Sequence, residues 1–304
     1  MSEIRFDDRV VIVTGAGGGL GRTYALEFGR RGAKVVVNDL GGAMDGTGAS
    51  ASMADKVVKE ITEAGGTAVS NHDSVSTPEG GEAIVQTAID NFGKVDVVIN
   101  NAGILRDKTF AKLSPDDLGL VIDVHLKGAF FVSQPAFRSM KDNGYGRFVF
   151  TASAAGIFGN FGQTNYGAAK MGLVGLSNVL AVEGAKYNIK SNVIAPLART
   201  RLTENLLGPM AERLSPECVT PLTVFLASEA NPNTHEIYSV GGGRFARIFV
   251  GLCPGWMSEE GPGAVVSAED VQSHLEQIRS PEGYIVPGSI TDEMGLVAKA
   301  FQGK

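Results

Sequence analysis

Short runs of β-branched and other apolar residues alternate along the chain with longer segments of helical periodicity. The runs are Val10–Val13, Val35–Val37, Val95–Ile99, Phe148–Phe150 and Asn192–Ala195. Between them, segments such as 23–31, 54–64 and 80–92 carry apolar residues three and four positions apart. Continuously apolar strands are typical of parallel sheets covered on both faces, and alternation with helices implies right-handed crossovers. The sequence therefore predicts an α/β fold built on a doubly wound parallel sheet.

The length of 304 residues suits one large domain with an appendage. Composition changes near Gly241, where glycine and aromatic residues become frequent and short helical patterns follow. Ser267 opens a capping-box-like start for a helix that runs on to Ile278, and Thr291 is placed to cap a last helix. We assign residues 1–250 to a single core domain. Residues 251–304 form a C-terminal extension that packs on the core or on a partner subunit.

Charge and composition exclude several classes of function. The net charge of −6 argues against capture of nucleic acid or of an anionic membrane surface. Two cysteines and four scattered histidines suit neither a disulfide framework nor a zinc site, so no metal is expected. No apolar run approaches the roughly 18 residues of a membrane helix, and the N-terminus lacks a secretory pattern. We expect a cytoplasmic protein with small-molecule partners.

A glycine-rich loop, Thr14-Gly-Ala-Gly-Gly-Gly-Leu-Gly21, follows the first predicted strand directly and opens a helix. Its spacing is T-G-x-x-x-G-x-G, with glycine at Gly15, Gly19 and Gly21 and with Leu20 before the last of them. Glycines permit a tight turn and the close approach of a pyrophosphate to a helix N-terminus, where free N–H groups favour anions. The loop predicts a dinucleotide site of the Rossmann type.

Asp39 ends the second predicted strand, close to 20 residues after the last glycine of the loop. An acid at this spacing accepts hydrogen bonds from the adenosine ribose hydroxyls. Its carboxylate repels a 2′-phosphate, and the loop contains no basic residue before Arg22, so the sequence favours NAD over NADP. The third and fourth strands are followed by further candidates for cofactor binding, namely Asp73, Ser74, Asn101, Ala102 and Gly103.

Tyr166 and Lys170 are four residues apart, which places a phenol and an ammonium group on one face of a helix. Alone, such a pair is common on solvated helices. Here Ser153 precedes it by thirteen residues, just after the fifth predicted strand, and the glycine loop lies upstream in the expected order. We interpret Ser153, Tyr166 and Lys170 as a catalytic group.

These ordered motifs resemble the short-chain dehydrogenase/reductase family over about residues 6–245. Several strings are further similar to the (3R)-hydroxyacyl-CoA dehydrogenase units of the multifunctional type 2 subgroup. They are residues 37–42 (VNDLGG), 101–107 (NAGILRD), 124–128 (VHLKG), 159–170 (GNFGQTNYGAAK) and 240–243 (VGGG).

The resemblance implies NAD-dependent hydride transfer between a secondary alcohol and a ketone, with a (3R)-hydroxyacyl-CoA and its 3-ketoacyl-CoA as the pair. Tyr166 is then the base in oxidation and the acid in reduction. Lys170 and the oxidised nicotinamide lower the pKa of the phenol, and Lys170 also binds the nicotinamide ribose. Ser153 donates a hydrogen bond to the substrate oxygen, while Pro196 and Thr200 contact the nicotinamide carboxamide.

Two positions depart from the family pattern. His125 stands where the family usually carries Asn, and Leu197 follows Pro196 where the family usually has Gly. His125 is either a mark of the subgroup or a buried structural histidine. The loop around Leu197 is one residue shorter than usual before Thr200, which affects the predicted contacts to the carboxamide.

Two other functions remain open from the sequence. The first is a hydroxysteroid or other bulky-alcohol dehydrogenase, since a fold does not determine a substrate. The second is a dinucleotide-binding sensor without catalysis, which only the departures at His125 and Leu197 favour. For assembly, we expect a two-fold dimer through the helical patterns of 118–131 and 165–182. A tetramer through the strand near Ile237–Val240 is the alternative.

Overall fold

The computed structural model describes residues 3–200, 208–261 and 263–301. The chain forms two compact units, Met1–Arg247 and Ile248–Lys304. The first unit contains the predicted strands and the predicted site, whereas the second contains three short helices.

The first unit is built on one eight-stranded sheet, with the strand order β3-β2-β1-β4-β5-β6-β7-β8. Strands β1 to β7 pair in parallel, and the order reverses direction between β1 and β4. This order and the flanking helices confirm the predicted doubly wound α/β fold. The strands are β1 Val10–Thr14, β2 Lys34–Asn38, β3 Thr67–Asn71, β4 Val97–Asn100, β5 Gly146–Thr151, β6 Ile189–Pro196, β7 Glu236–Gly241 and β8 Arg244–Ile248.

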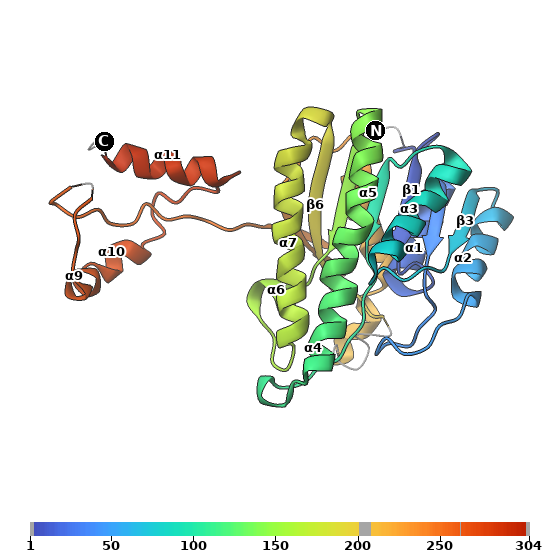
Figure 1. Ribbon diagram of the computed structural model, residues 1–304, viewed down its shortest axis with the longest axis horizontal. Coiled ribbons are helices and arrows are strands. Elements are labelled where there is room, and N and C mark those ends of the chain that lie inside the picture. The colour runs from blue at the N-terminus through green and yellow to red at the C-terminus, as the bar shows by residue number, and fades with distance from the viewer. Residues whose placement is uncertain (1–2, 201–207, 262, 302–304) are drawn as a thin grey trace. The chain divides into compact units, whose positions relative to one another are not determined.

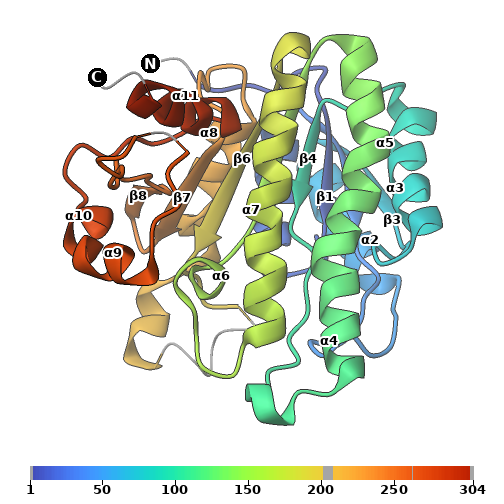
Figure 2. The same cartoon turned by 60° about the vertical axis from the view of Figure 1, so that its left-hand side comes forward.

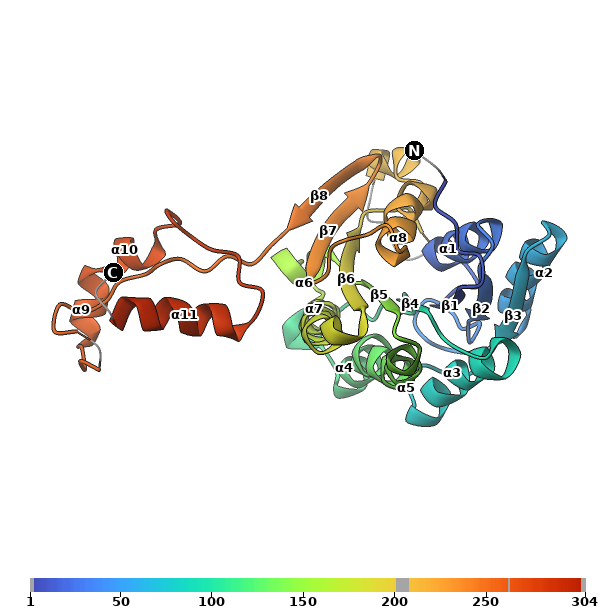
Figure 3. The same cartoon turned by 90° about the horizontal axis from the view of Figure 1, so that it is seen from above.

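Helices cover both faces of the sheet, which explains why strands such as β1, β4 and β5 are buried along their whole length. Figure 3 shows α3, α5 and α7 on one face and α1, α2 and α8 on the other. The helices of this unit are α1 Gly19–Arg30, α2 Ser52–Glu63, α3 Pro78–Phe92, α4 Pro115–Ile122, α5 Gly128–Asn143, α6 Ala154–Phe158, α7 Thr164–Gly184 and α8 Thr220–Ala227. Single turns are η1 Phe110–Lys112, η2 Asp123–Lys127, η3 Ala185–Tyr187, η4 Gly208–Arg213 and η5 Pro216–Cys218.

The longest of these helices is α7, which runs beside α5 along the sheet (Figure 1). Both helices carry glycine where they pack closely against neighbouring segments: Gly128 of α5 lies against Val75, and Gly172 of α7 lies against Leu126. A Cβ on Gly172 of α7, for example, would lie only 2.9 Å from the side chain of Leu126. Within the described ranges, no helix combines the length and apolar character that crossing a membrane requires.

The edge of the sheet differs from the expectation. The sequence predicted β7 as the last strand, but β8 adds next to it. A two-residue turn at Gly242 and Gly243 joins them, and both glycines have positive φ (57° and 83°). Glycine is favoured at both positions of such hairpin turns because they need a left-handed backbone. β8 therefore occupies the edge of β7 through which the tetramer alternative was expected to form.

The second unit contains the helices α9 Ala268–Ser273, α10 Leu275–Arg279 and α11 Ile290–Phe301. The capping box predicted at Ser267 is confirmed, with Asp270 as its partner. The prediction of a single helix after this cap is wrong, because the helix is interrupted at His274. The ring of His274 stacks on that of Trp256, with 4.0 Å between centroids. The predicted cap Thr291 is also wrong, because α11 already begins at Ile290 and places Thr291 inside the helix.

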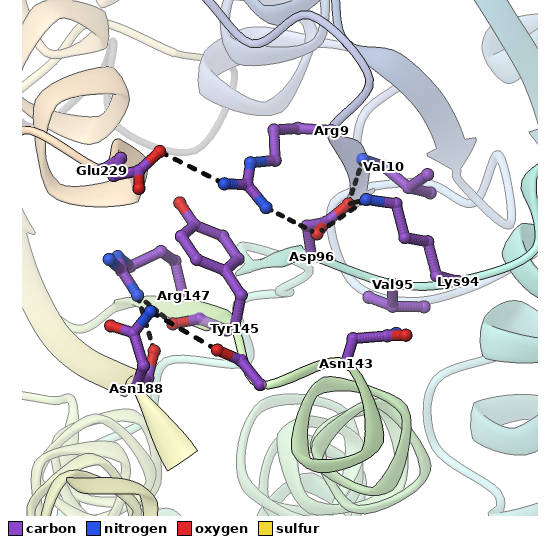
Figure 4. Close-up of polar contacts among 12 residues, drawn as sticks. Arg9, Val10, Lys94, Val95, Asp96, Asn143, Tyr145, Arg147, Asn188 and Glu229 are labelled. Atoms are coloured by element: carbon purple, nitrogen blue, oxygen red, sulfur yellow. Dashed lines mark hydrogen bonds and ion pairs between the residues drawn. The ribbon is translucent and has the colours of Figure 1, made fainter. Parts of the chain in front are cut away.

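A polar cluster lies at the amino ends of the central strands, opposite to the strand ends that carry the predicted site (Figure 4). Asp96 is 1% exposed, accepts the N–H of Val10 at 2.8 Å and pairs with Arg9 at 3.1 Å and Lys94 at 2.9 Å. Arg9 also lies 3.6 Å from the centre of the Tyr145 ring. Asp96 thus joins β1 to the segment before β4 by one carboxylate.

Arg147 completes the cluster from β5 and is 2% exposed. Its guanidinium donates to the carbonyls of Gly146 (2.7 Å), Asn188 (2.8 Å) and Ser228 (3.2 Å) and lies 4.2 Å from the centre of the Tyr145 ring. Burial lowers the pKa of Arg147 and raises that of Tyr145. The three carbonyls and the ring replace the water that a buried cation loses.

We expect Asp96→Asn to lower the free energy of unfolding by about 1–3 kcal/mol, because Arg9 and Lys94 lose their buried negative partner and an NH2 donor replaces one of the two acceptor oxygens. Urea denaturation followed by circular dichroism measures the change. Asp8→Asn is the matched control, since Asp8 is exposed and lies 3.8 Å from its partner Lys34. Surface changes of that kind usually stay within about 0.5 kcal/mol. Equal effects of the two variants would contradict the role given to Asp96.

Candidate active site

One cavity of about 640 Å³ opens at the carboxyl ends of the parallel strands. In Figure 2, the arrowhead of β6 points to the end of the sheet at which α6 lies. The loops after β1 to β6 all contribute to the wall, as expected for a ligand site at the point where the strand order reverses. The predicted site residues that line it are Gly15, Gly19, Leu20, Asp39, Asp73, Ser74, Asn101, Ala102, Gly103, Ser153, Tyr166, Lys170, Pro196 and Thr200.

The loops after β1 and β4 are joined by Thr14 and Asn101. The Thr14 hydroxyl accepts the N–H groups of Asn101 (3.0 Å) and Ala102 (3.1 Å). The side-chain amide of Asn101 donates in return to the carbonyls of Thr14 (3.0 Å) and Gly15 (3.1 Å). Asn101 is therefore used by the protein itself, and it holds the glycine loop in place beside the cavity.

Two glycines of the loop, Gly15 and Gly21, leave no room for a side chain. A Cβ on Gly15, which has φ +63°, would lie 2.7 Å from the Cα of Ala102. A Cβ on Gly21 would lie 2.2 Å from the carbonyl oxygen of Gly15, so Gly21 packs behind the loop and does not line the cavity. Gly19, at φ +50°, begins α1 and lies beside Thr200. This cradle at a helix N-terminus fits the pyrophosphate of a dinucleotide.

Asp39 lies at the cavity end of β2. One carboxylate oxygen accepts the N–H of Gly17 and the other that of Gly41, each at 2.7 Å. The carboxylate is thus oriented from both sides, and each oxygen keeps a lone pair for a further donor. This arrangement suits two adjacent ribose hydroxyls.

Asp73 is positioned by its neighbours on the adjacent strands. Asn71 donates to its carboxylate at 2.7 Å, and Asn38 donates to its main-chain carbonyl at 2.9 Å. Ser74 follows it in the cavity wall, where its hydroxyl bonds to that of Ser76 at 2.8 Å. The structure therefore brings both predicted residues to the same side of the cavity as Asp39.

Ser153, Tyr166 and Lys170 all line the cavity: Ser153 precedes α6 as its N-cap residue, and Tyr166 and Lys170 lie on α7. Ser153 caps α6 by accepting the N–H of Ala155 at 3.2 Å. Lys170 is 3% exposed, donates to the carbonyl of Thr151 at 2.6 Å and lies 5.5 Å from the centre of the Tyr166 ring. The structure thus brings the predicted catalytic set together, with Tyr166 and Lys170 one helical turn apart on α7 and Ser153 in hydrogen-bonding reach of the Tyr166 hydroxyl.

Burial dominates the titration of the phenol and the ammonium group. It raises the pKa of Tyr166 to about 12, which the hydrogen bond with Ser153 opposes. Burial lowers the pKa of Lys170 to about 7. In the protein alone, the phenol of Tyr166 therefore stays protonated near neutral pH, and Lys170 loses its proton far more readily than an exposed lysine, since desolvation disfavours charge of either sign.

His125 lies in a π-helical turn, η2, and is buried. Its Nε2 is 3.0 Å from the main-chain nitrogen of Ile104 and 2.7 Å from the carbonyl oxygen of the same residue. Its ring meets that of Tyr166 edge-on, with 5.2 Å between centroids. Burial and the nearby Lys170 hold the pKa of His125 well below its usual range, so the imidazole is neutral. It lines the cavity without an ionic role.

Several residues that line the cavity were not predicted as site residues, although some of them lie within the strings that carry the family resemblance. They are Leu40, Gly42, Ala43, Met44 and Gly46 after β2, Ile104 and Leu105 after β4, and Phe158, Asn160 and Gln163 before α7. The glycines at 41, 42, 46 and 48 were the available signal for the first group, because connections of this length without secondary structure are usually functional. Among the described residues, no group of three or more His, Cys, Asp or Glu side chains could hold a metal.

A family model described as short chain dehydrogenase matches residues 9–207. The chain belongs to this family. It is an oxidoreductase of the short-chain dehydrogenase type, and the motifs at 14–21, 153, 166 and 170 lie inside the matched range. Family membership also implies binding of a nicotinamide dinucleotide.

Two relatives extend the similarity beyond the family model. Peroxisomal multifunctional enzyme A of Dictyostelium discoideum is 47% identical over 302 residues, which cover 99% of this chain and 67% of the relative. A short-chain type dehydrogenase/reductase of Mycobacterium tuberculosis is 50% identical over 282 residues, which cover 92% of this chain and 97% of the relative.

Two solved structures share the fold. Full-length peroxisomal multifunctional enzyme type 2 of Drosophila melanogaster has a TM-score of 0.82 and 37% identity, covering 99% of this chain. The chain spans half the length of that protein. A 7α-hydroxysteroid dehydrogenase, in complex with NADH and 7-oxo glycochenodeoxycholic acid, has a TM-score of 0.71 and 29% identity, covering 79% of this chain and 95% of the other.

Proposed function

We propose that the protein is an NAD-dependent dehydrogenase that interconverts a (3R)-hydroxyacyl-CoA and its 3-ketoacyl-CoA. The observation that carries the proposal is the convergence of Ser153, Tyr166 and Lys170 on a cavity whose other end holds Asp39 and the glycine cradle. A proton-transfer group and a dinucleotide cradle in one cavity suit hydride transfer coupled to proton transfer.

A nicotinamide dinucleotide held in this cavity would supply the hydride acceptor for oxidation of the alcohol and the hydride donor for reduction of the ketone. Tyr166 accepts the hydroxyl proton during oxidation and donates it during reduction, while Ser153 donates a hydrogen bond to the same substrate oxygen. With its pKa raised to about 12, the phenol is ready to act as the acid. Its use as the base requires positive charge nearby, which a protonated Lys170 and the oxidised nicotinamide ring provide.

Other residues of the predicted set would hold the dinucleotide. The cradle of Gly15, Gly19 and Leu20 would receive the pyrophosphate, with Gly21 keeping the loop tight. Asp39 would bind the adenosine ribose and disfavour a 2′-phosphate. Asp73 and Ser74 are assigned to the adenine side, and Asn101, Ala102, Gly103, Pro196 and Thr200 to the nicotinamide side.

The acyl-CoA assignment is supported by the resemblance to the (3R)-hydroxyacyl-CoA dehydrogenase units of the multifunctional subgroup, with which the similarity to the multifunctional relatives agrees, and by an apolar cavity wall. Phe158 lines the cavity and is 71% exposed, which suits contact with an acyl chain. The similarity to the 7α-hydroxysteroid dehydrogenase supports the second candidate, a bulky-alcohol dehydrogenase, because the same wall suits a steroid. The intact Ser153, Tyr166 and Lys170 argue against a sensor without catalysis.

Assembly and location belong to the proposal as well. We propose a homodimer in which α7 and the region of α4 and α5 pack against their copies, since symmetric dimers are the commonest soluble assemblies. The helix α7 presents Val179 and Val182 at its exposed surface, each 54% exposed. We further propose that residues 251–304 pack on the core or on the partner subunit, and that the protein works in the cytoplasm.

We expect Tyr166→Phe to keep NAD binding and to lower kcat by at least about 10²–10⁴-fold, because it removes the proton-transfer group. Initial rates at 340 nm with a panel of hydroxyacyl-CoAs and hydroxysteroids measure the loss. Tyr187→Phe, in η3 after α7, is the matched control. Lys170→Ala should weaken both kcat and NAD binding. Near-normal turnover by Tyr166→Phe on the best substrate would contradict the assigned role.

We expect the wild-type protein to prefer NAD over NADP in kcat/KM, and Asp39→Ala to narrow that ratio by about 1–3 kcal/mol. The reason is the loss of charge repulsion against a 2′-phosphate together with the loss of ribose hydrogen bonds. Asp90→Ala on the exposed face of α3 is the control. A wild-type preference for NADP would exclude the role given to Asp39.

We expect the full chain to be a dimer and a chain ending at Val250 to lose either its dimeric state or its activity. The cut is placed there because β8 ends at Ile248 and stays intact. Light scattering of both proteins and their rates on the substrate panel make the comparison. A monomeric full chain would overturn the proposed role of the extension. A shortened chain with unchanged oligomeric state and unchanged activity would overturn it as well.

A further inference from the structure

The connection from β2 to α2, residues 40–51, takes a long path, and we call it the strap. Its base is closed by the N–H of Ser50, which donates to the carbonyl of Leu40 at 2.9 Å. Near its tip, the carbonyl of Met44 accepts the N–H of Leu105 at 2.9 Å. Since Leu105 follows β4, the strap crosses from the end of β2 to the chain beyond β4.

The strap is part of the cavity wall, through Leu40, Gly42, Ala43, Met44 and Gly46. It begins directly after Asp39, whose carboxylate accepts the N–H of Gly41. At its far end, a Cβ on Gly46 would lie 3.1 Å from Ile104, which packs in the same apolar cluster as Tyr166. A dinucleotide that reaches from Asp39 to Tyr166 would therefore lie along the strap.

The tip of the strap is mostly exposed, so few contacts hold it in place. Arg106 supplies one of them, because its Nε donates to the carbonyl of Asp45 at 2.8 Å. The other side of the same guanidinium donates to the carboxylate of Asp117, at the start of α4, at 3.2 Å. Segments with few buried contacts open at a low cost in free energy, so the loss of one contact changes their opening measurably.

The main-chain carbonyl of Arg106, which any substitution of the side chain retains, belongs to the network that positions the catalytic helix. The side-chain amide of Asn165 donates to the carbonyls of Arg106 (3.0 Å) and Asp117 (3.2 Å). Its oxygen accepts the main-chain N–H of Tyr166 at 2.8 Å. The residue that holds the strap is thereby joined to the first turn of α7.

We propose that Arg106 is a positioning residue that holds the strap closed along the dinucleotide cavity and thereby slows release of the cofactor. The inference rests on the proposed function, since it assigns the cavity beside the strap to a nicotinamide dinucleotide. Arg106 does not line the cavity, so its effect passes through the main chain of Asp45. The planar guanidinium bridges two acceptors at fixed spacing, which a point charge does not reproduce.

The test measures NADH dissociation from the full chain by stopped-flow fluorescence and hydrogen exchange of residues 40–51 without cofactor. We expect Arg106→Ala to raise the dissociation rate constant about ten-fold, the size expected for a hydrogen bond from a charged donor. Exchange within 40–51 should rise in parallel, while exchange of the sheet stays unchanged. At saturating NAD, kcat should fall no more than two-fold, whereas KM for NAD rises.

Arg30→Ala is the matched control, because it removes the same charge from surface pairs with Glu3 and Glu27, far from the strap in sequence. It should leave both readouts at wild-type values. Unchanged dissociation and unchanged exchange in Arg106→Ala would overturn the proposal. A wild-type protein that binds neither NADH nor NADPH would instead overturn the proposed function, while the exchange measurement still reports on the strap.

Two further variants protect the test against misfolding of Arg106→Ala. Asp117→Asn removes the charge that holds the far side of the guanidinium, and it should raise dissociation and strap exchange in the same direction. Arg106→Lys keeps the charge but loses the bridge, so it should restore less than half of the effect on a logarithmic scale. Full rescue by Arg106→Lys, or no change in Asp117→Asn, would contradict bridging by Arg106.

Discussion

The hydrogen bonds between Thr14 and Asn101 join the two loops between which the sheet reverses its strand order. The chain after β1 and the chain after β4 turn to opposite faces of the sheet at this point. The two loops therefore share no strand pairing, and side-chain hydrogen bonds hold them together. Thr14 accepts two N–H groups from the loop after β4, and Asn101 returns two bonds to the loop after β1. The glycine cradle, the cavity and the approach to Tyr166 all depend on this junction.

The catalytic group shows a conflict between burial and charge. Lys170 and Tyr166 are placed where desolvation favours the neutral amine and the neutral phenol. Forming an ammonium–phenolate pair in this site is therefore costly for either charge alone, and each charge reduces the cost of the other. The proposed chemistry uses this coupling: the positive charge of an oxidised nicotinamide favours the phenolate only while the cofactor is bound.

The amino and carboxyl ends of the strands are organised differently. At the amino ends of the strands, Asp96 and Arg147 are almost fully buried, and their side chains bond to chain segments at the start of several strands (Figure 4). At the carboxyl ends, the strap is mostly exposed. Its tip is held by the side chain of Arg106 and by the main-chain hydrogen bond from Leu105 to Met44. Strands held firmly at their amino ends, with a weakly held strap at their carboxyl ends, suit a site that must admit and release a large cofactor.

The sequence by itself determined the doubly wound sheet, the glycine cradle and the grouping of Ser153, Tyr166 and Lys170. These follow from apolar periodicity, from glycine's conformational freedom and from the rule that parallel strands end at one edge. Tertiary structure decided what depends on contacts between distant segments. β8, the break at His274, the packing of His125 against Ile104 and the crossing of the strap to Arg106 all depend on partners remote in sequence, which no local pattern encodes.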